Sequence, residues 1–238
     1  MVIYYRISNN SYNKPKLSNL TKENCLLNAI KHFYDNVSKF YIIGDNVTET
    51  SLKEFLDDLP GKLNKISVEY TSLGNSGSFR YIYNLAMSQN LPEETIYFLE
   101  DDYVHKDNSY NMMLEGLKLG DYVTLYDHPD MYHNTADGGD NPFIEQGGEV
   151  TRVLKGDTSH WKISMSTTMT FATTVKVLME DIEIWDKHSR FDAPTDFYGF
   201  LELRDKGRKL VLPLPGYSTH ACIGYLTPFH DWEKELIK

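Results

Sequence analysis

The sequence predicts an α/β fold with a mostly parallel central sheet that is flanked by helices on both faces. Through residue 126, apolar runs typical of strands alternate with segments of helical periodicity. Strands that alternate with helices form right-handed βαβ units and hence parallel sheets. The apolar runs also lack a polar face, as expected for strands covered on both sides. The 238 residues suit one large domain or two small ones, and without an internal linker or repeat we predict a single domain.

Each element of the first half has its own local signal. Strands are predicted at residues 2–8, 39–44, 65–70, 95–100 and 121–127. Helices are predicted from Thr21 to about Val37 and at residues 50–58 and 78–89. Thr21 is a suitable N-cap for the first of these helices, and the apolar residues that follow it recur on one face. Gly44 closes the second strand.

The second half has a more irregular pattern. Residues 127–160 are rich in Asp, Gly, His and Asn and are predicted to form long loops, whereas residues 159–173 favour β-structure. Helices are predicted near 174–186 and near 194–206, and Gly207 ends the second of them. Residues 209–221 form a last strand and loop.

Composition and charge exclude some functions. A net charge of −10 argues against sequence-independent binding of nucleic acid. The N-terminus lacks the pattern of a signal peptide, and no apolar stretch approaches the length of a membrane span. Cys25 and Cys222 lie far apart in sequence and are expected to be reduced thiols. We therefore expect a soluble protein of the cytoplasm, without a nucleic-acid partner.

Polar side chains follow four of the predicted strands at the point where each strand ends. Arg6 and Ser8 end the first strand, Asp45 ends the second, and residues 72–77 form a small-residue loop after the third. Glu100, Asp101 and Asp102 end the fourth. Because open α/β sheets bind ligands beyond the carboxyl ends of their strands, these side chains indicate a binding site.

The acidic triplet at 100–102 is the most unusual of these features. Two like charges about 4 Å apart repel by roughly 1 kcal/mol in water and about 4 kcal/mol near a protein surface. The run is either a solvated turn or a site for a cation such as Mg²⁺ or Mn²⁺, which prefers oxygen ligands. The sequence contains no Walker motif, no G-x-G-x-x-G after a strand, no H-E-x-x-H and no cysteine cluster for zinc. A metal with carboxylates is therefore the predicted means of binding phosphate.

The chain resembles a known family. The acidic triplet after a nucleotide-binding βαβ half is similar to the D-x-D motif of glycosyltransferases with the GT-A fold. The resemblance is closest to the small glycosyltransferase domain of large algal DNA viruses, the chloroviruses. It covers most of the chain and is carried by these motifs: YYRIS at 4–8, NCLLN at 24–28, SLGN at 72–75, YFLEDDYVH at 97–105, GDYVTLYDHPD at 120–130, SHWK at 159–162, STTMTFATTV at 166–175 and YSTH at 217–220.

The resemblance implies a Rossmann-like, GT-A fold with a donor half at 1–126 and an acceptor and catalytic half at 127–238. It implies transfer of a sugar, hexosyl or deoxyhexosyl, from a UDP-sugar to a hydroxyl of a glycan or glycoprotein, with inversion. Asp45 would lie near the uracil, and Asp102, Asp101 and His220 would bind Mn²⁺ or Mg²⁺. The residues implied to contact the donor are Arg6, Ile7, Ser8, Asp45, Asn75, Glu100 and Asp101. Without the resemblance, Asp45 is equally a turn residue and His220 an ordinary packed histidine.

The resemblance also implies the catalytic and acceptor residues. Asp196, in the first turn of the helix after Pro194, would be the general base that deprotonates the acceptor. Asp192 is the alternative base and Glu149 a weaker one. Asp196 is otherwise explained as a carboxylate favoured at a helix start by the dipole. The aromatic and imidazole rings implied on the acceptor side, or else ordinary packing residues, are Tyr126, His128, Tyr132 and Trp161.

Two other functions stay open on sequence. A sugar nucleotidyltransferase also combines a nucleotide, a metal and an α/β sheet, but its glycine-rich phosphate loop is missing here. The second alternative is a sugar-binding module that has the same fold but no catalytic turnover. Release of pyrophosphate rather than UDP would identify the first, and metal-independent binding the second.

Overall fold

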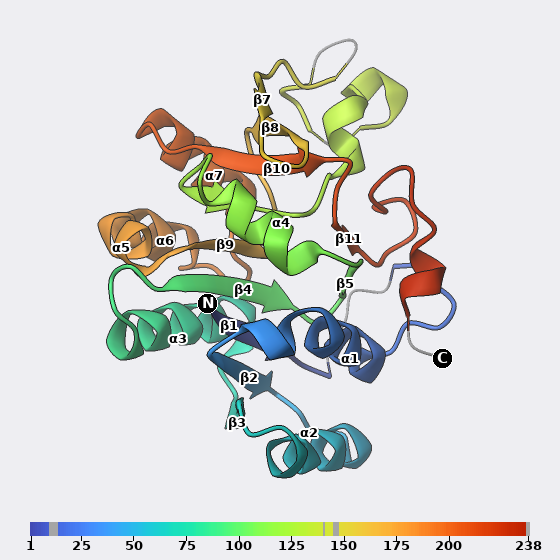
Figure 1. Cartoon of the computed structure of the whole chain (residues 1–238), viewed down its shortest axis with the longest axis vertical. Helices are drawn as coiled ribbons and strands as arrows, with labels where there is room; N and C mark the ends of the chain where they lie inside the picture. Colours follow the sequence, from blue (N-terminus) through green and yellow to red (C-terminus); the bar gives the residue numbers. More distant parts are fainter. Residues whose placement is uncertain (10–13, 140, 145–147, 237–238) are drawn as a thin grey trace.

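The computed structural model describes residues 1–9, 14–139, 141–144 and 148–236. Its centre is a nine-stranded sheet with the order β3-β2-β1-β4-β9-β6-β10-β8-β7 (Figure 1). The four strands of the first half, β1 (Val2–Ile7), β2 (Lys39–Asp45), β3 (Ile66–Thr71) and β4 (Thr95–Glu100), are parallel to one another. Arg6 of β1 is aligned with Ile43 of β2 and with Glu100 of β4, so the carboxyl ends of these three strands lie side by side.

The second half of the sheet is mixed. It contains β6 (Tyr122–Val123), β7 (Val153–Lys155), β8 (His160–Ser164), β9 (Phe171–Thr174) and β10 (Leu210–Leu214). The pairings β4–β9, β9–β6, β10–β8 and β8–β7 are antiparallel and β6–β10 is parallel, so β8 and β9 run against the other strands. A separate antiparallel pair joins β5 (Tyr103–His105) to β11 (Ser218–His220).

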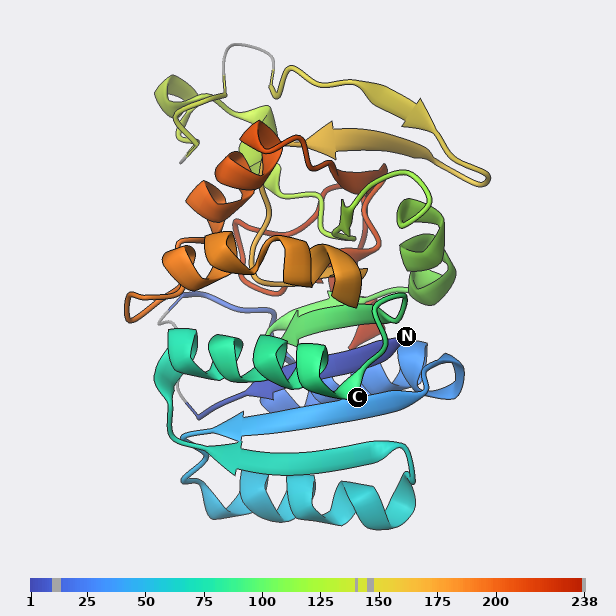
Figure 2. The same ribbon diagram turned by 90° about the vertical axis from the view of Figure 1, so that its left-hand side faces the viewer.

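Helices cover both faces of the sheet, and Figure 2 is seen from the face covered by the helices within residues 74–89 and 175–205. On one face lie α1 (Lys22–Phe33), α2 (Thr50–Lys62) and α4 (Ser109–Gly116), whose apolar residues pack against Ile3 and Tyr5 of β1. On the other lie α3 (Gly74–Gln89), α5 (Val175–Glu180), α6 (Ile182–His188) and α7 (Asp196–Asp205), which pack with Val2 and Tyr4. Alternate residues of one strand thus enter two cores, as expected for a strand covered on both faces.

Most elements lie where the sequence predicts them, and the differences have local causes. Thr21 caps α1 through its side chain, which accepts from the backbone N–H of Asn24, as predicted. Helix α3 begins at Gly74 rather than at residue 78, because the N–H groups before residue 78 bond to a buried carboxylate described below. The predicted strand at 121–127 keeps only two residues. The segment predicted as β-structure at 159–173 forms two strands, β8 and β9. The sequence analysis did not predict α4 or β5.

Short 3₁₀ turns complete the chain at Tyr34–Asn36, Pro129–Tyr132, Thr135–Asp137 and Trp232–Glu235. The predicted loop at 127–160 includes residues 140 and 145–147, which lie outside the described residues. Cys25 and Cys222 are both buried and are not joined by a disulfide. Within the described ranges, no helix is both long and apolar enough to cross a membrane.

Candidate active site

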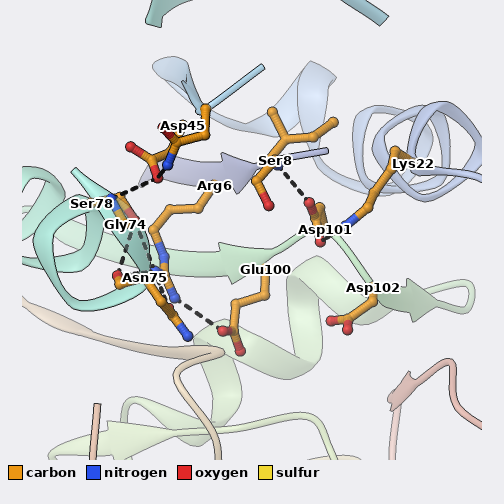
Figure 3. Close-up of a pocket in the computed structure, with 12 residues that line it drawn as sticks. Arg6, Ser8, Lys22, Asp45, Gly74, Asn75, Ser78, Glu100, Asp101 and Asp102 are labelled. Carbon is orange, nitrogen blue, oxygen red and sulfur yellow. Dashed lines mark hydrogen bonds and ion pairs between the residues drawn. The ribbon is translucent and has the colours of Figure 1, made fainter. Parts of the chain in front are cut away.

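A cavity of about 310 Å³ opens at the carboxyl ends of β1, β2 and β4, where α3 begins (Figure 3). All of the residues implied to contact the donor line it, so the prediction that the strand ends converge is correct. The cavity is lined by Arg6, Ile7, Ser8, Lys22, Asp45, Asn46, Gly74, Asn75, Ser78, Glu100, Asp101 and Asp102.

Arg6 ties β1 to both α3 and β4. Its Nη1 donates to the backbone oxygen and Oδ1 of Asn75 at 2.8 and 2.9 Å and to Ser78 Oγ at 3.1 Å, while Nη2 donates to Glu100 Oε1 at 3.0 Å. The guanidinium is almost fully buried, which its several partners compensate. The arginine therefore holds the start of α3 and Glu100 in a fixed arrangement at the cavity wall.

Asp45 organises the loop between β3 and α3. Its Oδ1 accepts from the Thr71 hydroxyl at 2.8 Å and the Leu73 N–H at 2.7 Å, and its Oδ2 accepts from the Gly74 N–H at 2.9 Å. The sequence predicted that the first N–H groups of this helix would face an anion. They do, but for Leu73 and Gly74 the anion is Asp45 itself, so those two N–H groups are not available to a phosphate.

Asp101 is paired with a lysine that the sequence analysis missed. Lys22 Nζ lies 2.6 Å from Asp101 Oδ1, and the N–H of Ser8 donates to Oδ2 at 2.8 Å. Burial raises the pKa of Asp101, although the charge of Lys22 opposes this. The position of Lys22 was itself a signal, because a cation in the first turn of a helix opposes the helix dipole and needs a local reason.

Asp102 faces His220 across the β5–β11 pairing. His220 Nε2 lies 2.9 Å from Asp102 Oδ2, and Cys222 Sγ lies 3.9 Å from the same nitrogen. Ligand atoms of these three residues all lie within 4.8 Å of one another. Burial would raise the pKa of Asp102, but hydrogen bonding to His220 and its charge outweigh burial and lower it. Asp102 and His220, both predicted as metal ligands, are thus in contact.

Two further carboxylates hold their protons more tightly than usual. Burial raises the pKa of Glu100 to about 7 despite the opposing charge of Arg6, and the charges of Asp102 and Asp196 add to the increase. Burial likewise raises the pKa of Asp196 to about 6, although the backbone N–H of Phe197, which donates to Asp196 Oδ1 at 2.8 Å, and the charge of Arg6 oppose this. Asp196 begins α7, as predicted.

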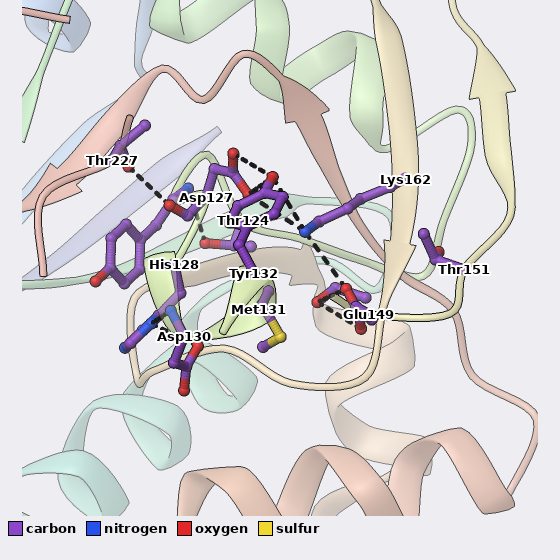
Figure 4. Close-up of polar contacts among 12 residues, drawn as sticks. Thr124, Asp127, His128, Asp130, Met131, Tyr132, Glu149, Thr151, Lys162 and Thr227 are labelled. Carbon is purple, nitrogen blue, oxygen red and sulfur yellow. Dashed lines mark hydrogen bonds and ion pairs between the residues drawn. The ribbon is translucent and has the colours of Figure 1, made fainter. Parts of the chain in front are cut away.

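The two alternative bases are in different surroundings. Asp192 is exposed, and its backbone oxygen accepts from the N–H of Ser76 at 3.3 Å. Glu149 is buried in a network in which Lys162 Nζ lies 3.4 Å from Glu149 and 3.3 Å from Asp127 (Figure 4). A carboxylate that pairs with a buried lysine is a weaker candidate than Asp196 for accepting a proton from an acceptor.

Two of the implied acceptor-side aromatics belong to the interior. Trp161 is fully buried, and its indole N–H donates to Glu115 Oε1 at 2.8 Å. Tyr126 is also buried, and its hydroxyl donates to the backbone oxygen of Tyr225 at 2.7 Å. Neither ring can stack on a sugar from these positions, so both expectations are corrected. His128 and Tyr132, by contrast, are partly exposed.

The fold has known counterparts among solved structures. A structure of GalNAc-T7 with UDP, GalNAc and Mn²⁺ superposes with a TM-score of 0.63 at 12% identity over 92% of this chain. Two structures of TarS from S. aureus, one of them in complex with UDP, give TM-scores of 0.54 and 0.53 at 13% and 14% identity over 91% and 92% of the chain. The chain spans only 42% of the GalNAc-T7 chain and 36% and 60% of the two TarS chains. No protein-family model and no curated protein matches the sequence. The fold is the GT-A glycosyltransferase fold, as the sequence predicted.

Proposed function

We propose that this chain is a metal-dependent glycosyltransferase that transfers a sugar from a UDP-sugar to a hydroxyl of a glycan or glycoprotein, with inversion. The main support is the position of Glu100, Asp101 and Asp102 at the carboxyl end of β4 in a GT-A fold. All three line the cavity, and Asp102 contacts His220. Each carboxylate of the triplet has a different partner: Glu100 pairs with Arg6, Asp101 with Lys22 and Asp102 with His220.

The donor would occupy the cavity at the ends of β1, β2 and β4. Arg6, Ile7 and Ser8 would contact the nucleotide, with Asp45 near the uracil. Asn75 and Glu100, which both accept hydrogen bonds from Arg6, would also contact the donor. Asp101, held by Lys22, would face the ribose or the cation.

The residues near Asp102 fit a divalent cation. Asp102 and His220 offer an oxygen and a nitrogen that already lie within hydrogen-bond distance, and both side chains are partly open to solvent. These donor atoms suit Mn²⁺ or Mg²⁺, with Asp101 as a further oxygen. When bound, the cation would supply charge neutralisation for the departing UDP.

Asp196 would act as the general base. A base is most effective when its pKa lies near the working pH, and burial brings that of Asp196 to about 6. It would take the proton of the acceptor hydroxyl, whose oxygen then forms the new bond to the anomeric carbon as the bond to UDP breaks. His128 and Tyr132 would lie on the acceptor side.

The test combines binding with turnover. Calorimetry should detect UDP binding that requires Mn²⁺ or Mg²⁺, and a survey of UDP-sugars should find one that is consumed with release of UDP. The Asp102→Ala variant should lose both with metal added. Near-normal transfer by this variant would contradict the metal site. Pyrophosphate release would indicate a nucleotidyltransferase, and sugar binding without turnover an inactive module.

Four finer proposals accompany this function. The stereochemistry is tested by NMR of the anomeric proton, which should report inversion in the first product formed. A cytoplasmic location and a closer relation to the chlorovirus glycosyltransferase domain rest on sequence alone. The division into a donor half at 1–126 and an acceptor half at 127–238 describes the ligands each part would contact.

A further inference from the structure

We propose that Cys222 joins Asp102 and His220 as a protein ligand at the cation site, and that these three residues together form a site selective for a thiophilic divalent cation such as Zn²⁺. This inference rests on the proposed function only in placing a cation at Asp102 and His220. The inference adds a sulfur ligand to the site. Thiophilic cations would therefore compete with Mn²⁺ or Mg²⁺ for the same residues.

The three donor atoms converge on one point. Cys222 Sγ lies 3.9 Å from His220 Nε2, and Asp102 Oδ2 lies 2.9 Å from that nitrogen. In a tetrahedral zinc site with a Zn–S bond of about 2.3 Å and a Zn–N bond of about 2.0 Å, sulfur and nitrogen are roughly 3.5 Å apart. Shifts of a few tenths of an ångström, within reach of side-chain rotation, would convert the observed cluster into that arrangement.

The backbone holds this cluster in place from two sides. His220 ends β11, and Cys222, two positions later, forms an antiparallel β-bridge with Lys16, so the two side chains lie on the same face. Between them, Ala221 donates its N–H to the backbone oxygen of Asp102 at 2.8 Å and accepts from the N–H of Leu17 at 3.2 Å. The thiol is therefore fixed beside the Asp102–His220 pair by backbone hydrogen bonds.

The donor set determines which cation is preferred. Sulfur and imidazole nitrogen suit Zn²⁺ and its thiophilic relatives, whereas Mg²⁺ and Mn²⁺ prefer oxygen and bind N/S sites less tightly. A hard cation at Asp102 would depend on oxygens from the donor diphosphate to complete its shell. A thiophilic cation needs no nucleotide, because three side chains of this chain already supply its ligands.

The exposure of the three residues allows a cation to enter. The Cys222 side chain is almost fully buried, but Asp102 and His220 keep 17% and 18% of their side-chain surface exposed. Entry is therefore from the side of the cavity, and the thiol closes the site from behind. Zinc held by three protein ligands would keep a single open position, which is too few to engage a nucleotide diphosphate as a six-coordinate cation does. We expect zinc to inhibit transfer.

The test uses Cd²⁺ as a spectroscopic probe, without nucleotide. Binding of cadmium to a thiolate produces an ultraviolet charge-transfer band that carboxylate and imidazole ligands do not produce. The wild-type protein should develop this band and saturate with an equimolar amount of metal. The matched control is Cys25→Ser, which removes a buried thiol outside the cluster. It should retain the band, whereas Cys222→Ser should lose it.

Zinc affinity and turnover give independent readouts. Loss of the thiol ligand should weaken Zn²⁺ binding by at least about tenfold and relieve zinc inhibition. A second variant, His220→Gln, should keep the band but require more cadmium to reach it. The proposal is overturned if Cys222→Ser keeps the band or its zinc affinity, or if Cys25→Ser loses the band. Failure of the proposed function would appear differently, as absent UDP turnover with the cadmium band intact.

Discussion

His220 Nε2 lies 2.9 Å from Asp102 Oδ2, although 118 positions separate the two residues in the chain. The pairing of β5 with β11 sets His220 opposite Tyr103 and so places the imidazole beside the carboxylate. Burial would lower the pKa of His220, but hydrogen bonds to Asp102 and Cys222 outweigh it and raise that pKa to about 10. In the metal-free protein the pair is therefore ionised at neutral pH.

This pair predicts how stability depends on pH. Because the folded pKa of His220 lies above its ordinary 6.5, its contribution is complete below pH 6.5 and is lost as the pH rises through about 10. Because the pKa of Asp102 lies below its ordinary 3.8, its contribution is present above pH 3.8 and is lost on acidification. Urea unfolding of chelator-treated protein should show the alkaline loss, of about 2 kcal/mol. His220→Gln should abolish it, and an unchanged profile would contradict the ion pair.

Asp196 and Asp192 form a matched pair for testing the base. Asp196→Asn should lower kcat by about 10²- to 10⁴-fold while donor binding persists, because the acceptor hydroxyl keeps its proton. With the wild type, kcat should rise with pH through about 6 as Asp196 loses its proton. Asp192→Asn, at an exposed position, should leave kcat and this pH dependence unchanged. Steady-state kinetics across the pH range measure both, and loss of donor binding in Asp196→Asn would assign it another role.

Arg6→Lys tests whether the planar fork of the guanidinium is needed. A lysine retains the charge but cannot reach Asn75, Ser78 and Glu100 at once. We expect UDP affinity to fall by about tenfold to a hundredfold, since charged hydrogen bonds contribute roughly 1.5–3 kcal/mol. Calorimetry with UDP and Mn²⁺ measures this. Wild-type affinity would mean that charge alone is sufficient.

Asp45→Asn tests the loop that precedes α3. The amide group can replace only one of the two acceptor oxygens that bind Leu73 and Gly74. We expect the free energy of unfolding to fall by about 1–3 kcal/mol, the cost of a buried donor left without a partner. The control is Asp58→Asn, whose carboxylate is exposed and pairs with Lys62. Denaturant unfolding distinguishes the two, and equal stabilities would contradict the role of Asp45.

Trp161→Phe separates a core residue from an acceptor residue. The change removes the indole N–H that donates to Glu115, and it leaves a cavity next to Gly116, where the indole ring packs. The free energy of unfolding should fall by about 1–3 kcal/mol, while the KM for the acceptor stays at its wild-type value. A raised acceptor KM with unchanged stability would restore Trp161 to the acceptor side.

The sequence predicted those parts of the site that depend on local pattern. Arg6, Asp45 and Asp102 each follow an apolar run, and parallel strands bring such positions to one edge regardless of side-chain detail. Lys22 was missed because its partnership with Asp101 links a helix start to a strand end 79 residues away, a contact that periodicity does not encode. Trp161 was misassigned because an aromatic residue in a β-prone segment has the same pattern whether its ring faces the core or a ligand.

The position of β9 has a consequence for engineering. This strand comes from the second half of the chain, yet it lies between β4 and β6, which both come from the first. A fragment ending at residue 126 would leave the long edge of β4 unpaired, and such edges recruit other chains. The two halves therefore cannot be exchanged as cassettes between enzymes of this fold. Chimeras should instead be joined within surface turns, so that β9 and the strands on either side of it come from one parent.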